Sequence, residues 1–131
     1  MAKKGKGNRI FVEGGKVRVP IETEFKNNIF YFEDKAEWGF EPDATCMFEN
    51  NLFYNVSPRG ENLLTVNPMF VNPGSGGTNI DMLDLQRLSG YWLKENSLCM
   101  EAGAIINKNG GKDLCGNPLY KGLPDIGAFE Q

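Results

Sequence analysis

Apolar residues gather on either side of an asparagine pair in two blocks of this chain, residues 25–31 and 48–54. The blocks read Phe-Lys-Asn-Asn-Ile-Phe-Tyr and Phe-Glu-Asn-Asn-Leu-Phe-Tyr, so five of seven positions are identical and the second block begins 23 residues after the first. Neither block spaces its apolar residues as one face of a helix does, and Ile, Phe and Tyr favour strands. The pattern predicts a strand on each side of each asparagine pair.

The asparagine pairs Asn27-Asn28 and Asn50-Asn51 fit sharp corners between these strands. Asparagine tolerates the left-handed backbone conformation, and its amide forms local hydrogen bonds. An asparagine that recurs at the same corner of successive coils can also stack on its copy as an amide ladder, at about the 4.8 Å spacing of paired strands. We therefore expect two stacked corners.

A repeat interval of this length indicates an architecture of stacked coils. It suits one turn of a parallel β-helix, whereas a leucine-rich repeat needs leucines at fixed offsets that are missing here. The alternative is two ordinary strands that share a motif by chance. We predict an all-β chain with a few parallel β-helix coils over residues 1–73, beginning with alternating strands near 9–13 and 16–21.

The composition changes from Gly74 onward to glycine- and asparagine-rich loops. Short strands are expected at 63–66, 69–71 and 91–93, and a short helix over 81–88. The open end of a coil stack exposes unpaired strand groups and apolar core, so another segment has to cover it. We expect residues 74–131 to form a loop-rich capping segment of the same domain.

Composition narrows the function classes. A chain of 131 residues with a net charge of −3 is expected to be one domain with no nucleic-acid-binding field, and no segment is apolar enough to span a membrane or to act as a signal peptide. Histidine is absent, which excludes His-dependent catalysis, and no metal site or cofactor is expected. Cys46, Cys99 and Cys115 are interpreted as buried free thiols, with a Cys99–Cys115 bridge as the alternative in an exported protein.

The polar stretch over residues 35–43 is the candidate binding loop, because loops vary without disturbing stacked strands. An aromatic ring can stack on a sugar face while carboxylates accept hydrogen bonds from hydroxyls. On that basis Asp34, Glu37, Trp38 and Asp43 are the candidate carbohydrate-binding residues. The competing interpretation is that Trp38 packs down to cover a coil while the acids are simply solvated.

Several blocks together resemble the C-terminal end of secreted bacterial right-handed parallel β-helix proteins of the pectate-lyase-like group. They are the two asparagine blocks, then residues 67–73, 90–103, 113–118 and 125–130, in that order. The chain departs from the usual family motifs with Asn67 for Asp, Leu98 for Pro, Glu101 for Asp and Phe129 for Tyr. These changes keep size or polarity, and the resemblance covers most of the chain from about residue 25.

The resemblance implies the C-terminal portion of a carbohydrate-active protein of the polysaccharide lyase or glycoside hydrolase type, not catalytic alone. The family is secreted, periplasmic or on the cell surface, while this chain shows no signal peptide. The matching motifs are structural, so they assign no catalytic residue. Two alternatives stay open: a non-catalytic glycan-binding module, and a structural cap or oligomerisation segment that pairs with a second copy through its first coil.

Overall fold

The computed structural model describes residues 9–10, 21–39, 41, 44–77, 84–119 and 122–131. Within these residues strand is the main regular structure and helix is scarce, which confirms the mostly β character expected from the sequence. The elements in chain order are β1 (Arg9–Ile10), β2 (Glu24–Lys26), β3 (Ile29–Tyr31), β4 (Glu37–Trp38), β5 (Met47–Glu49), β6 (Leu52–Tyr54) and the 3-10 helix η1 (Leu85–Tyr91).

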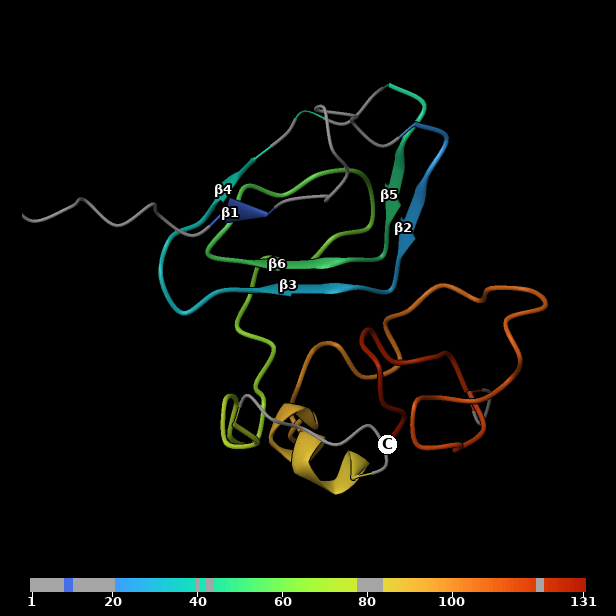
Figure 1. The fold of residues 1–131 in the computed structure, drawn as a ribbon. Helices are drawn as coiled ribbons and strands as arrows, with labels where there is room; N and C mark the ends of the chain where they lie inside the picture. The colour runs from blue at the N-terminus through green and yellow to red at the C-terminus, as the bar shows by residue number, and fades with distance from the viewer. Residues whose placement is uncertain (1–8, 11–20, 40, 42–43, 78–83, 120–121) are drawn as a thin grey trace, which may run out of the picture.

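The strands form three parallel pairs, β1 with β4, β2 with β5 and β3 with β6. The register of the last two pairs matches the sequence repeat, because Phe25 pairs with Phe48 and Phe30 with Phe53. Figure 1 shows β5 and β6 following the same cornered path as β2 and β3, directly beside them. The described residues form only these short two-stranded sheets and do not close into a complete solenoid.

The first hydrophobic core lies inside the corner that the strands make. Equivalent rings of successive blocks stack face to face, with ring centroids 4.4 Å apart for Phe25 and Phe48 and 5.0 Å apart for Phe30 and Phe53. Ala36 and Val56 are buried in the same cluster. The repeat thus brings identical side chains into contact, which is why a repeated sequence folds into a stacked structure.

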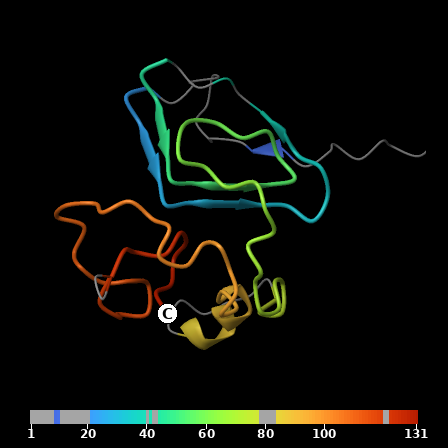
Figure 2. The same cartoon turned by 180° about the vertical axis from the view of Figure 1, so that it is seen from behind.

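A second core lies on the opposite face of the β3–β6 sheet. Figure 2 shows the C-terminal part of the chain, residues 84–119 and 122–131, gathered on the outer side of these two strands. Leu52 of β6 packs there with Leu93, Cys99 and Ile126, and all four are at most 5% exposed. Because both faces of this sheet are covered, its strands are apolar at every position rather than at alternate positions.

Beyond β6 the regular pairing fades. Two isolated parallel bridges, Glu49 to Glu61 and Leu52 to Leu64, continue the stack at a shorter interval of 12 residues. The strands predicted over 63–66 and 69–71 are therefore wrong, since Leu64 and Phe70 take part only in single bridges. Pro68, which is buried and has no N–H to donate to a strand ladder, lies in the chain between these two residues.

The secondary structure predicted for residues 81–93 also needs correction. Residues 81–83 lie outside the described residues, and the helix that is present is a 3-10 helix from Leu85 to Tyr91. Tyr91 is thus helical rather than extended, and Leu93 forms a single antiparallel bridge to Phe70. A Cβ at Gly90 would lie 2.2 Å from the carbonyl oxygen of Asn72, so only glycine permits this close approach.

The predicted first coil and the predicted binding loop are described only in part. Residues 11–20, which carry most of the predicted first coil, lie outside the described residues. Residues 35–43 are not wholly a loop, because Glu37 and Trp38 form β4 and pair with β1. No helix in the described part of the chain is long and apolar enough to cross a membrane.

Candidate functional site

The structure describes three of the four predicted carbohydrate-binding residues. Asp34 and Glu37 are exposed, and Trp38 is half-buried. Asp43 lies outside the described residues.

Trp38 is held by packing. Its indole lies 5.5 Å from the ring of Phe30 and 6.0 Å from that of Phe48, measured between centroids. The indole Nε1 donates a hydrogen bond to the carbonyl oxygen of Ser57 at 2.7 Å. The Arg59 guanidinium lies 4.6 Å from the ring centroid. Trp38 therefore packs against the first core, and a sugar would have to displace Arg59 to stack on the face that the guanidinium covers.

Arg59 is itself paired with Glu41. The two guanidinium nitrogens Nη1 and Nη2 lie 3.1 and 3.3 Å from the two carboxylate oxygens, a forked arrangement. Gly60, which follows, has a φ of +85°, and a Cβ there would lie 2.0 Å from the carbonyl oxygen of Phe48. This corner of the molecule is thus fixed by packing and charge pairing.

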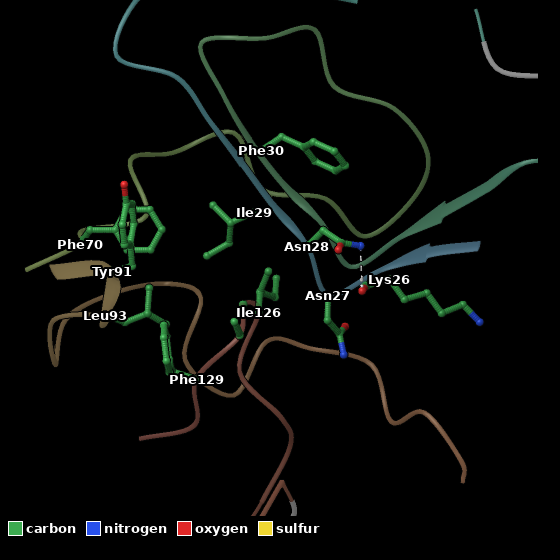
Figure 3. A pocket seen from close by; sticks show the side chains of 12 residues that line it. Lys26, Asn27, Asn28, Ile29, Phe30, Phe70, Tyr91, Leu93, Ile126 and Phe129 are labelled. Carbon is green, nitrogen blue, oxygen red and sulfur yellow. Dashed lines mark hydrogen bonds between the residues drawn. The ribbon is translucent and has the colours of Figure 1, made fainter. Parts of the chain in front are cut away.

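A groove with a volume of about 500 Å³ lies elsewhere, between the β2–β3 corner and the C-terminal part of the chain. In Figure 3, Phe70 and Tyr91 stand on one side of it, Lys26, Asn27 and Asn28 stand opposite, and Ile29 and Ile126 lie between. The remaining lining residues are Phe30, Leu93, Gly127, Ala128 and Phe129. We call this the seam groove.

Four aromatic rings form a row that ends at the seam groove, and each ring contacts the next. Tyr54 stacks on Tyr31 with centroids 5.5 Å apart, Tyr31 meets Phe70 edge-on at 5.3 Å, and Phe70 meets Tyr91 edge-on at 5.5 Å. Burial raises the pKa of Tyr31, with smaller contributions in the same direction from Glu33, Tyr54 and Tyr91. Tyr91, at the end of this row, is 36% exposed and lines the groove.

The opposite wall is built from the asparagine corners. Asn27 and Asn50 have φ angles of 57° and 50°, the left-handed conformation expected from the sequence. The buried Asn51 carboxamide oxygen accepts hydrogen bonds from Asn28 N and Nδ2 at 2.9 and 3.1 Å, which confirms the predicted amide ladder. The ladder fixes Asn28, whose own carboxamide oxygen has no donor among the described residues.

The left-handed asparagines hold the C-terminal segment against the corner. Asn27 donates to the carbonyl oxygen of Ala104 at 2.8 Å and accepts from the N–H of the same residue at 2.7 Å. Asn50 donates to the carbonyl oxygen of Ala102 at 2.9 Å. A Cβ at Gly103 would lie 2.8 Å from the carbonyl oxygen of Pro124, so the tight fit here requires glycine. The asparagine wall of the groove is thus held by the ladder between the two coils and by the hydrogen bonds to the C-terminal segment.

Lys26 carries the one positive charge among the described lining residues of the seam groove. Its Nζ lies 3.2 Å from Glu24 and 3.5 Å from Glu49. The hydrogen bond to Glu24 and the charge of Glu24 raise the pKa of Lys26, burial opposes them, and Glu49 adds to the rise. Two carboxylates surround one ammonium, so this end of the groove has no excess positive charge.

A second cavity of about 390 Å³ adjoins the first. Its lining residues are Val71, Trp92, Leu93, Cys115, Asn117, Phe129, Glu130 and Gln131. Leu93 and Phe129 line both cavities. The two spaces are therefore neighbours, separated by this pair of buried apolar side chains.

Three acids lie near the second cavity and organise the end of the chain. Asp125 accepts hydrogen bonds from the N–H groups of Glu101 and Gln131, and Glu130 accepts one from the N–H of Asp125. Asp113 accepts one from the N–H of Glu130 at 3.0 Å. No group of three metal-ligating side chains that could hold an ion occurs in the described part of the chain. The acids therefore act as backbone acceptors.

The local environments of Asp113 and Glu130 shift the pKa values of their carboxyl groups in opposite directions. For Asp113, partial burial works to raise the pKa, but hydrogen bonds from Glu130, Asn117 and Cys115 outweigh it and lower the pKa. For Glu130, burial raises the pKa, the charges of Asp125 and Asp113 add to the rise, and the hydrogen bond from Asp125 opposes it.

The three cysteines are free, so the alternative of a Cys99–Cys115 bridge is not realised. Cys99 is buried in the second core, where desolvation raises the pKa of its thiol. Cys115 is exposed at the second cavity, contrary to the expectation of buried thiols. The difference arises because Cys115 lies in a turn at the surface.

Sequence reasoning missed the seam groove because its walls come from segments about 60 to 100 residues apart, such as Asn28, Tyr91 and Phe129. One signal was available: residues 29–31 and 52–54 are apolar at consecutive positions, which indicates a sheet covered on both faces. If another segment covers the outer face of these strands, a boundary must run between that segment and the sheet. Pockets often form at such boundaries between packed elements.

No model of a known protein family matches this chain, and comparison with curated proteins gives no match.

Proposed function

We propose that this chain is the C-terminal part of a right-handed parallel β-helix protein of the pectate-lyase-like group, and that it binds glycans in the seam groove without cleaving them. The single observation that carries the binding proposal is the groove itself, with an exposed ring, Tyr91, facing the amide of Asn28 across an apolar floor. The coil assignment is supported by the 23-residue parallel register and the amide ladder.

The groove has the mixture of surfaces that sugars require. A pyranose presents apolar C–H groups on one face and hydroxyl groups around its edge. Tyr91 and Phe70 offer rings for the face, while the carboxamide oxygen of Asn28 and the Tyr91 hydroxyl offer polar partners for the edge. The asparagine ladder and the second core fix both walls, so little ordering entropy would be lost on binding.

The acids do not favour hydrolysis. Glycoside hydrolysis needs two carboxyl groups on either side of the scissile bond. Among the described residues that line the seam groove none is acidic, and Glu130 is the one acid among those of the second cavity. Neither space thus offers the required pair, which supports binding rather than catalysis.

The test is a glycan-array and degradation screen of the purified chain with neutral and acidic plant and host polysaccharides, read for binding and for new reducing or unsaturated ends. We expect binding and no new ends. Tyr91→Ala should weaken binding about tenfold, corresponding to ~1.4 kcal/mol, because the stacking ring is lost. Tyr91→Trp should keep most of the affinity, since it retains an aromatic face.

Leu98→Ala is the matched control, because Leu98 is 61% exposed and lies outside the groove. It should leave binding unchanged. Urea unfolding of each variant separates a lost contact from a lost fold. Absence of any glycan binding, or binding unaffected by Tyr91→Ala, would refute the proposal, and new ends would overturn its non-catalytic part.

A further inference from the structure

The seam groove and the second cavity are built in succession along the same two chain segments. In residues 91–93, Tyr91 lines the groove, Trp92 lines the second cavity and Leu93 lines both. In residues 128–130, Ala128 lines the groove, Glu130 lines the second cavity and Phe129 lines both. The antiparallel bridge between Leu93 and Phe70 fixes the first segment in place.

Each space combines one prominent aromatic residue with polar side chains. The groove has Tyr91 with Asn28, and the second cavity has Trp92 with Asn117 and Gln131. The amides supply both donors and acceptors, which suits hydroxyl groups that act as both. The same chemistry is therefore offered twice, on either side of Leu93 and Phe129.

The charges near both spaces are unfavourable for an anionic ligand. Lys26 is flanked by Glu24 and Glu49 in the groove. Glu130 lines the second cavity and bonds the backbone N–H of Asp125, a second acid beside it. Glu24 and Glu49 offset the charge of Lys26 in the groove, so a uronate carboxylate gains little there. In the second cavity it would meet the like charge of Glu130, and like charges at close range repel.

We infer that the two cavities are consecutive subsites for one linear, uncharged oligosaccharide, with one sugar against Tyr91 and a later one against Trp92. This inference rests on the proposed glycan-binding function. It adds that the ligand is a chain rather than a single sugar, and that it carries no carboxylates. Occupying two sites through one molecule makes the second contact intramolecular, so affinity should rise with chain length.

The test is titration calorimetry with uncharged cello-, xylo- and manno-oligosaccharides, from the monosaccharide to the hexasaccharide, and with oligogalacturonates of the same lengths. In the series that binds, affinity should rise by about tenfold or more with length and then level off once both subsites are filled. Oligogalacturonates should bind more weakly than uncharged chains at every length.

Cys115→Trp places a large side chain in the second cavity, and Leu114→Trp is its matched control, because Leu114 is the neighbouring residue, 48% exposed and outside both linings. Cys115→Trp should remove the gain with length while leaving the affinity for the shortest ligand unchanged, and Leu114→Trp should preserve the gain. Urea unfolding confirms that both variants fold.

The outcomes separate the inference from the function on which it rests. Length-independent binding that is still lost in Tyr91→Ala would overturn the second subsite and leave the seam groove standing. Tighter binding of oligogalacturonates would overturn the uncharged ligand class. If no oligosaccharide of any length binds, the inference fails, and the glycan array decides whether the proposed function fails with it.

Discussion

At the scale of single residues, the asparagine pair divides two tasks between its members. The first asparagine of each pair, Asn27 or Asn50, takes the left-handed conformation and points its amide at the C-terminal segment. The second, Asn28 or Asn51, forms the ladder between coils. One dipeptide thus supports both the stacking of the coils and the attachment of the segment that covers them.

Replacing Asn27 tests the first of these tasks. Asn27→Gly keeps the left-handed corner but removes both hydrogen bonds to Ala104, so we expect a loss of about 1–3 kcal/mol in the free energy of unfolding. Asn27→Ala should cost a further ~1 kcal/mol, because alanine is strained at this φ. Urea unfolding measures both values.

Asn62→Gly is the matched control for this experiment. Asn62 has a φ of 49°, and its amide has no hydrogen-bond partner among the described residues. Its replacement should change stability by less than about 0.5 kcal/mol. An equal loss in Asn27→Gly and Asn62→Gly would show that the bonds to Ala104 contribute nothing.

At single residues, the sequence predicted the contacts that recur between the two repeated blocks, but it did not predict contacts with the C-terminal segment, which has no repeat. The corner conformation and the ladder follow from the amide chemistry of asparagine and from the repeat. Ala104, the partner of Asn27, lies 77 residues further along the chain, and no sequence repeat connects the two positions. For Trp38 the sequence left two interpretations open, a sugar-binding ring or a ring packed on a coil, and its contacts with Phe30 and Phe48 agree with packing.

At the scale of elements, the β3–β6 sheet is a common wall between two hydrophobic cores. Phe53 is 1% exposed in the first core and its neighbour Leu52 is 0% exposed in the second. β6 is also paired on both edges, with β3 on one side and Leu64 on the other. It is therefore the central strand of the described structure.

Truncations on the two faces of β6 should accordingly be severe and similar in size. We expect Phe53→Ala to cost about 3–5 kcal/mol and Leu52→Ala about 2–5 kcal/mol, because each leaves a cavity in a different core. Met47→Ala on β5 serves as the control, since Met47 is 52% exposed and should lose less than about 0.5 kcal/mol.

Denaturant unfolding of the three variants gives these values. A mild effect of Leu52→Ala, comparable with that of Met47→Ala, would mean that the C-terminal segment does not pack on the outer face of β6 in solution.

Element prediction was accurate within the repeat and poor outside it. The strands on both sides of each corner were predicted because their residue types and repetition agree. Residues 63–71 also have the residue types of strands, but Leu64 and Phe70 form only single bridges to different partners. Pro68, between them, has no N–H to donate to a ladder. The helix ending at Tyr91 depends on the close approach of Gly90 to Asn72, which is a tertiary contact.

At the scale of the whole molecule, the acids at the end of the chain couple stability to pH in two opposing ways. The pKa of Glu130 in the folded state is raised above its ordinary value of 4.5. As the pH falls, the folded state therefore binds this proton before the unfolded state does, and the free energy of unfolding rises until the pH reaches about 4.5. The pKa of Asp113 is lowered below 3.8, so stability is lost at still lower pH, where the unfolded state binds its proton first.

Two isosteric variants separate these effects in urea unfolding between about pH 3 and pH 7. Glu130→Gln should abolish the rise in stability that the wild type shows as the pH falls toward 4.5, yet still accept the hydrogen bond from Asp125. Asp113→Asn should lose about 1 kcal/mol at neutral pH and flatten the acid limb, because it accepts fewer hydrogen bonds. Identical pH profiles in the wild type and both variants would show that neither carboxyl is linked to folding.

The common wall also has a consequence for how the chain is made. β3 and β6 leave the ribosome well before Leu93 and Ile126, which cover their outer face. At about 5–20 residues per second, the apolar outer side of the nascent sheet waits on the order of several seconds for its cover. During that interval it is a target for chaperones and for other nascent copies, so slowing translation between Tyr54 and Leu93 should lower the yield of soluble protein.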